Sequence, residues 1–137
     1  VKHETSQYFS GALRYLSGDD TWQNWQTVGV QGLNDFAVRL SEKSYQKILV
    51  KALSQIPAPV LHPLCSALEN VNLSVEVIDA LVAEFNQTVE GNNDRQAGDQ
   101  SFLLRSLSSS CQHPHVIRFI NSLIENLKPL TAIYFIV

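Results

Sequence analysis

Hydrophobic residues in this chain recur with the 3.6-residue period of amphipathic helices, in short segments separated by turn-forming residues. The strongest segment, residues 77–85, has its apolar side chains at Val77, Ile78, Leu81, Val82 and Phe85. The period predicts helices that begin near residues 4, 21, 44, 59, 75, 100 and 114. The apolar end of the chain, from Leu130 to Val137, fits either a helix or a strand, and we favour a helix. No other segment alternates with the period of two that is typical of strands, so we expect an all-α fold.

Residues that start or stop helices separate these segments. Gly18 ends the first segment, and Pro57 and Pro59 divide the third from the fourth. Ser74 and Asp99 stand where a side-chain oxygen can cap the helix that follows. Because the joints are short, neighbouring helices should run antiparallel and form hairpins. Such hairpins either stack as an array or close into an irregular bundle.

Two places interrupt the helical pattern. Gly29 and Gly32 fall on the second segment, and glycine weakens a helix, so we expect a kink or a break there. Residues 90–98 have no apolar pattern and are expected to form the one long loop of the chain.

Composition and charge narrow the class of protein. The chain has 137 residues, of which 45% are hydrophobic and 17% charged, enough for one helical domain with a buried core. A net charge of −3 argues against a nucleic-acid partner, and the longest apolar run is too short to span a membrane. Methionine is absent, even at position 1, so we expect residues 1–137 to be an excised part of a longer protein.

Two short stretches resemble a known family. Asp35-Phe36-Ala37-Val38-Arg39 resembles the Asp-x-x-Val-Arg stretch at the turn into the second helix of HEAT-like repeats. With Phe102-Leu103-Leu104-Arg105-Ser106-Leu107, the layout is similar to an uncharacterised gammaproteobacterial family of helical-repeat proteins. The resemblance covers most of the chain and implies stacked hairpins and a bacterial cytoplasm, but it assigns no activity to any position. The spacing departs from regular repeats around Gly29 and in residues 90–98.

Cysteine and histidine residues form the one candidate metal site. Cys111, His113 and His115 lie within five residues, and His62 and Cys65 are one helical turn apart elsewhere. Thiolate and imidazole are good zinc ligands, yet this spacing is not a usual zinc motif. The alternative is that Cys65 packs as a small apolar residue while the histidines start a helix. Two cysteines are too few for a disulfide scaffold, so we expect both to be reduced and intracellular.

A row of basic residues forms a candidate partner-binding surface. Arg39, Lys43, Lys47 and Lys51 recur every four residues and would share one face of a continuous helix. Residues 57–98 are acidic by contrast. The row could dock an acidic partner, or it could be a solvated face beside the chain's own acidic helices.

Aromatic residues near the N-terminus offer a second candidate contact. Trp22 and Trp25 follow Tyr8 and Tyr15 at helical spacing, which favours the core of the first hairpin. An exposed edge of Trp22 is the exception we expect, since aromatic side chains are enriched at interfaces.

These observations favour a protein-binding scaffold or adaptor over an enzyme. We find no catalytic constellation and no phosphate-binding loop, and we expect no cofactor. The expected setting is the cytoplasm, with an unidentified protein partner and self-association through Leu130 to Val137 if that end is uncovered. Two alternatives stay open, namely a metal-binding or enzymatic domain built on Cys111, His113 and His115, and a purely structural segment of a larger protein.

Overall fold

The structure, a computed structural model, describes the chain at residues 2–18, 22–90 and 97–136, with side chains described at 8–18, 29–89 and 98–126. Every regular element within these ranges is helical, which confirms the all-α class. The elements are α1 (Lys2–Leu16), α2 (Trp22–Ala37), α3 (Lys43–Leu53), α4 (Ala58–Leu68), α5 (Val75–Glu90), η1 (Ala97–Asp99), α6 (Gln100–Ser106), η2 (Ser108–Ser110) and α7 (Pro114–Ile136). None of these helices is both long enough and apolar enough to cross a membrane.

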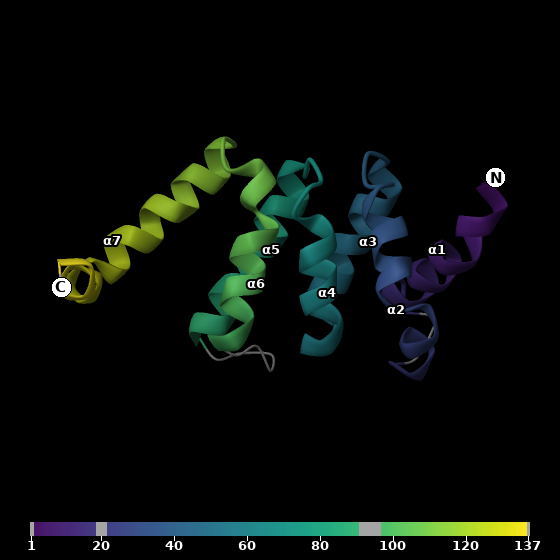
Figure 1. The fold of residues 1–137 in the computed structure, drawn as a ribbon. Coiled ribbons are helices and arrows are strands. Elements are labelled where there is room, and N and C mark those ends of the chain that lie inside the picture. Colours follow the sequence, from purple (N-terminus) through teal and green to yellow (C-terminus); the bar gives the residue numbers. More distant parts are fainter. Residues whose placement is uncertain (1, 19–21, 91–96, 137) are drawn as a thin grey trace.

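Alternate helices pack side by side and divide the molecule into two layers. One layer holds α1, α3, α5 and α7, each in contact with the next, and the other holds α2, α4 and α6 in the same way. The α1–α2 and α5–α6 contacts join the two layers. The chain therefore advances along an array, with its first and last helices at opposite ends (Figure 1).

The hydrophobic core lies between the layers and contains the residues that the helical period marks as apolar. A cluster of three rings joins the first three helices, with the ring centroids of Phe9 and Tyr45 5.3 Å apart and those of Phe36 and Tyr45 6.1 Å apart. At the other end, Phe85 of α5 and Phe119 of α7 meet edge to face at 5.2 Å. The largest fully buried side chains are Phe36, Leu33, Leu40, Leu49, Leu53, Leu61, Leu64, Leu68, Ile78, Leu81, Leu103 and Val60.

Several predicted helix boundaries are confirmed. Gly29 has φ 58° and ψ −156° inside α2, which produces the expected kink. The hydroxyl of Ser74 accepts the backbone N–H of Val77 at 3.4 Å at the start of α5. The apolar end of the chain is helical as far as Ile136, while Val137 lies outside the described residues.

One sequence prediction about a helix cap is wrong. Asp99 precedes α6 but makes no side-chain cap bond, because its carboxylate is bonded to His62 of α4 instead. The predicted start of a helix near residue 44 is confirmed, since α2 ends at Ala37 and α3 begins at Lys43, so Arg39 lies outside the helix that carries the lysines. Of the predicted loop, residues 91–96 lie outside the described ranges, and residues 97–99 form the short helix η1.

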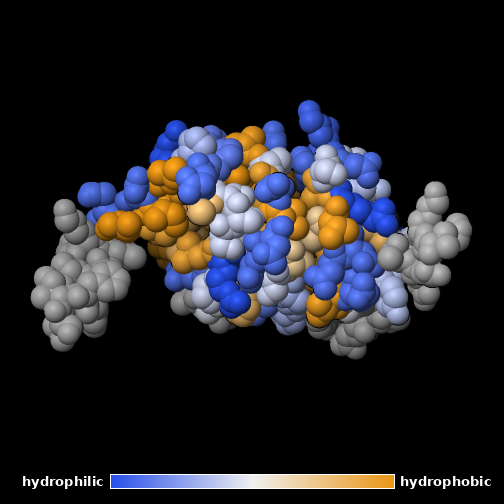
Figure 2. Space-filling model, turned by 45° about the horizontal axis from the view of Figure 1, so that its top comes forward, coloured by the Kyte–Doolittle hydropathy of each residue, from blue (hydrophilic) through white to orange (hydrophobic). Residues whose placement is uncertain are grey.

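Hydrophobic surface is interleaved with hydrophilic surface across the face drawn in Figure 2. Some of the exposed apolar area belongs to α7, where Ile117, Ile120 and Ile124 are 44%, 37% and 59% exposed. These three residues follow helical spacing and so share one side of α7.

Candidate functional site

The layer of odd-numbered helices has two grooves, one on each side of α5. The first lies between α3 and α5 and has a volume of about 420 Å³. The second lies between α5 and α7 and has a volume of about 310 Å³. Glu76 lines the first groove and Asp79 the second, and these residues are one helical turn apart on α5. The two grooves are therefore separated only by the ridge of α5.

The first groove, which we call the lysine groove, is lined by three lysines of α3. Lys43, Lys47 and Lys51 are exposed, and none of their ammonium groups makes a hydrogen bond or an ion pair with another described residue. Half-buried Val50 adds apolar surface between them, and Glu76 of α5 is the one carboxylate among the described residues that line the groove. Three positive charges against one negative charge give this groove a net positive charge.

Regular spacing on one helix creates this row. Residues 43, 47 and 51 are four apart, so their side chains lie one above the other on a single side of α3. The opposite side carries Leu49, Ala52 and Leu53, which are buried in the core and hold the helix in this orientation. Gln46 is held by a 2.6 Å hydrogen bond from its Nε2 to the carbonyl oxygen of Leu40.

Arg39 lies apart from the lysine row. It sits in the joint between α2 and α3, and its guanidinium group lies over the ring of Phe9, 4.3 Å from the centroid. A cation above an aromatic face is attracted by the ring's negative charge density. Arg39 thus packs on the α1–α2 hairpin and is not among the residues that line the lysine groove.

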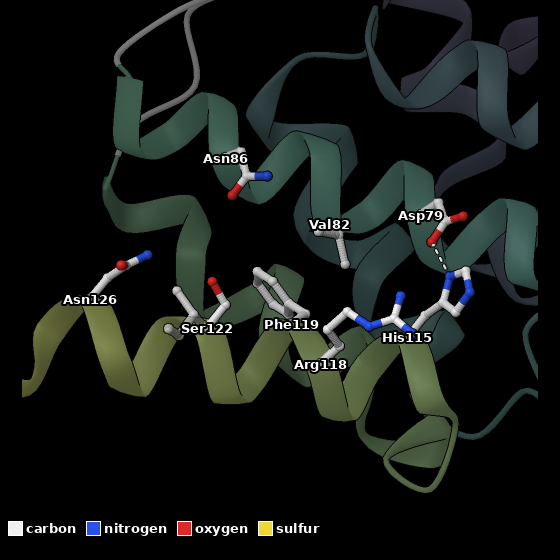
Figure 3. A pocket seen from close by; sticks show the side chains of 9 residues that line it. Asp79, Val82, Asn86, His115, Arg118, Phe119, Ser122 and Asn126 are labelled. Atoms are coloured by element: carbon white, nitrogen blue, oxygen red, sulfur yellow. Dashed lines mark hydrogen bonds and ion pairs between the residues drawn. The ribbon is translucent and has the colours of Figure 1, made fainter.

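The second groove, which we call the α5–α7 groove, has an apolar floor and polar walls (Figure 3). Val82, Phe119 and Leu123 provide the apolar surface. The polar residues that line it are Asp79, Asn86, His115, Arg118, Ser122 and Asn126.

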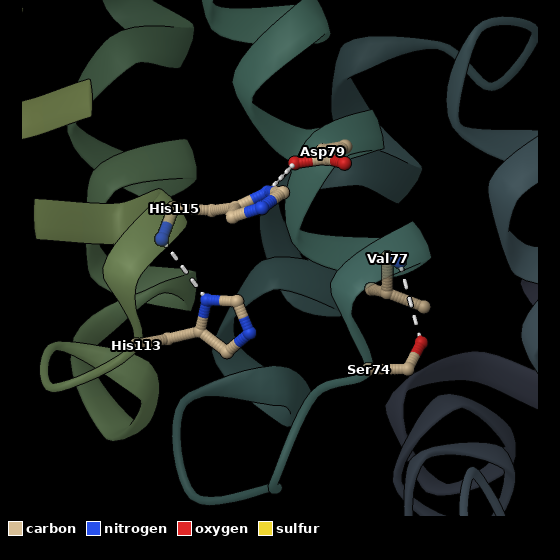
Figure 4. A network of polar contacts seen from close by, with 5 residues as sticks. All are labelled: Ser74, Val77, Asp79, His113 and His115. Carbon is tan, nitrogen blue, oxygen red and sulfur yellow. Dashed lines mark hydrogen bonds and ion pairs between the residues drawn. The ribbon is translucent and has the colours of Figure 1, made fainter. Parts of the chain in front are cut away.

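A pair of bonded residues closes one end of the α5–α7 groove. Nδ1 of His115 lies 2.8 Å from Oδ1 of Asp79, which joins the first turn of α7 to α5 (Figure 4). Nδ1 of His113 in turn accepts the backbone N–H of His115 at 3.1 Å. Both Nδ1 atoms are therefore engaged in holding the start of α7, as the structural alternative for these histidines predicts.

The candidate metal ligands do not come together. Cys65 is fully buried in α4 and Cys111 is exposed, and the two do not form a disulfide with each other. Within the described ranges, no three histidine, cysteine or acidic side chains are placed to share a metal ion. His62 is instead bonded to Asp99, with Nε2 and Oδ1 2.6 Å apart. This arrangement does not support the metal-binding or enzymatic alternative.

Two further sequence candidates fall where side chains are not described. Trp22 begins α2, but its side chain lies outside the described residues, as does that of Trp25. The side chains from Leu130 to Val137 lie outside them as well. The contacts expected of Trp22 and of the apolar end therefore stay predictions.

Sequence reasoning singled out the three lysines that line the lysine groove but missed the α5–α7 groove. The lysines repeat along one helix, so spacing alone placed them together. Asp79 and His115 are 36 residues apart and meet only because α5 and α7 pack side by side. The only signal in the sequence was the run of His115, Arg118 and Ser122 on one side of a helix, which is typical of any solvated face.

A protein-family model matches residues 1–137, and its description is a protein of unknown function, DUF3549. Comparison with curated proteins and with solved structures finds no match.

Proposed function

This chain belongs to the DUF3549 family of proteins of unknown function, and we propose that it is a helical-repeat scaffold that binds an acidic segment of a partner protein in the lysine groove. The observation that carries the proposal is the row of Lys43, Lys47 and Lys51, exposed and unpaired beside the apolar surface of Val50. If the chain's own acidic helices neutralised this face, these lysines would pair with neighbouring carboxylates. Among the described residues that line the groove, Glu76 is the only acidic one, and it makes no ion pair with the lysines.

The arrangement of the helices supports a scaffold role. Two layers of short helices expose long shallow surfaces, and proteins built from HEAT-like repeats use such surfaces to hold other chains. The Asp35–Arg39 stretch, which resembles a HEAT-like turn, spans the end of α2 and the joint to α3. We place the protein in a bacterial cytoplasm, a reducing compartment that suits the exposed thiol of Cys111.

Charge determines how such a partner would bind. Exposed ion pairs contribute only about 0.2–1 kcal/mol each, so three lysines supply steering and orientation more than affinity. The apolar surface of Val50 and of the lysine side-chain stems would supply the rest through burial. An acidic partner should therefore dissociate as the salt concentration rises.

The test compares two variants of equal net charge. Replacing Lys43, Lys47 and Lys51 by Gln lowers the net charge from −3 to −6. The control replaces exposed Gln55, Ser66 and Ser101 by Glu, which gives the same −6 but leaves the lysine groove unchanged. The full-length protein and both variants are used to capture partners from native cell extract, with recovery measured by mass spectrometry at low and high salt.

The expected result is a stoichiometric partner that the wild type and the control retain at low salt and the lysine variant loses. Retention of that partner by the lysine variant would show that the lysines are a solvated face. Recovery of no partner by any of the three proteins would favour a structural segment of a larger protein over a scaffold.

A further inference from the structure

We propose that the α5–α7 groove is a second, separate binding site, which takes an extended peptide with an apolar side chain about two residues from an acidic one. This inference does not depend on the lysine groove, which lies on the other side of α5. It rests on three features of the groove, namely its apolar floor, its carboxamide walls and its unpaired arginine.

The apolar floor would accept one hydrophobic side chain. Phe119 is 8% exposed and is fixed by its edge-to-face contact with Phe85, while Val82 and Leu123 are half-buried on either side. Because the floor belongs to packed helices, it is preformed and its shape does not depend on the ligand. Pockets for small ligands and peptide side chains are typically built from such preformed apolar surface with a few polar groups around it.

The walls at one end of the groove carry groups that pair with a peptide backbone. Asn86 projects from α5, and Ser122 and Asn126 project from α7 (Figure 3). All three are exposed, and their side chains make no hydrogen bond with another described residue. A carboxamide offers both donors and an acceptor, so it matches the N–H and C=O of a peptide unit.

The other end of the groove carries a positive charge without a partner. Arg118 is exposed, and its guanidinium group makes no hydrogen bond or ion pair with a described residue. Asp79, the one carboxylate among the described residues that line the groove, is already bonded to His115. The guanidinium group is therefore available to bind a carboxylate through two parallel hydrogen bonds.

The length of the groove determines how far apart the apolar and the acidic side chains of the peptide stand. Arg118 and Asn126 are eight residues apart on α7, which corresponds to about 12 Å along the helix. An extended chain covers that distance in about three to four residues. An apolar side chain over the floor would thus stand about two residues from an acidic side chain at Arg118.

A random peptide library displayed for selection against the full chain tests the proposal. We expect the selected peptides to share an apolar residue and an acidic residue about two positions apart. In fluorescence polarisation with one selected peptide, Arg118→Gln should weaken binding by up to about fivefold, the largest loss typical of an exposed ion pair. The double variant Asn86→Ala/Asn126→Ala should weaken binding as well. Because all three residues are exposed, these variants should keep the thermal unfolding of the wild type.

Two controls separate this site from the lysine groove and from a general charge effect. Arg105→Gln removes an arginine from α6 that does not line the groove, and it should bind the peptide like the wild type. The lysine variant with Gln at 43, 47 and 51 should also bind it normally, whatever the outcome for the acidic partner. The proposal would be overturned if the selected peptides shared no such pattern of residues. It would also be overturned if Arg118→Gln bound the peptide as tightly as the wild type does.

Discussion

His62 and Asp99 are joined by a 2.6 Å hydrogen bond between Nε2 and Oδ1 that ties α4 to the start of α6. The side chain of Asp99 is only 4% exposed, so its carboxylate depends on partners within the protein. The ring of His62 also stacks on Phe102, with 3.9 Å between centroids and 6° between planes. One imidazole therefore makes both a polar and an apolar contact across the layer that α4 and α6 share.

Replacing His62 by Ala should lower the free energy of unfolding by about 1–3 kcal/mol, because it removes the stack and one partner of a buried carboxylate. His62→Phe should recover part of this loss, since it retains a ring over Phe102 but cannot bond to Asp99. Urea denaturation of the three proteins measures the differences. An Ala variant as stable as the wild type would show that the contact between α4 and α6 does not depend on His62.

Replacing Gly29 by Ala should destabilise the protein by about 1–3 kcal/mol, because φ 58° with ψ −156° is a conformation that residues with a Cβ rarely adopt. No neighbouring atom lies within 4 Å of a Cβ at this position, so any effect comes from the backbone alone. Val30→Ala is the control, since Val30 is 55% exposed and adjacent in α2. Equal unfolding midpoints for both variants would contradict this account of the kink.

The helical period predicted most of the fold because it reports which side chains must be buried, and the core contains those residues. The helical period gave a wrong end for the helix before the joint between α2 and α3. Leu40 continues the apolar face of α2 and is 2% exposed, yet it lies beyond the end of that helix. A buried turn residue and a buried helical residue look the same in a periodic pattern. Arg39, which the four-residue spacing alone aligns with the lysines, lies in this same joint.

Pairs that are distant in sequence account for the other differences. Asp99 has the sequence position of a helix cap, but a histidine 37 residues earlier competes for its carboxylate and the tertiary contact prevails. Asp79 and His115 are likewise brought together only by helix packing. The lysine groove could be predicted because its residues share one helix. The α5–α7 groove could not, because single-helix spacing says nothing about which helices become neighbours.

Alkaline pH should destabilise the protein partly through Tyr15, because burial raises the pKa of its hydroxyl above the usual 10.0. The unfolded chain then loses this proton at a lower pH than the folded chain, so stability falls as pH rises above about 10. Phenylalanine has no proton to lose at this position. The free energy of unfolding of Tyr15→Phe should therefore fall less between about pH 9 and pH 11 than that of the wild type. The midpoints of urea unfolding across this pH range measure the difference. An equal loss of stability in both proteins would show that groups other than Tyr15 cause the loss.

The contact between α5 and α7 should depend on one side of α7 and not on the other. Phe119 is 8% exposed and packs edge to face on Phe85, whereas Ile124, five residues later on the same helix, is 59% exposed. Phe119→Ala should therefore cost about 3 kcal/mol through the lost burial and the cavity that remains, while Ile124→Ala should change stability by less than about 0.5 kcal/mol.

Chemical denaturation measures both variants, and hydrogen exchange at the amides of α5 and α7 shows where the structure loosens. We expect faster exchange near Phe85 in Phe119→Ala, because the docking of α7 is lost before the rest of the array unfolds. A comparable loss of stability in Ile124→Ala would mean that a second surface covers the exposed isoleucines in solution. Sedimentation at two protein concentrations would then distinguish a second copy of this chain from a contact within one molecule, since only the first depends on concentration.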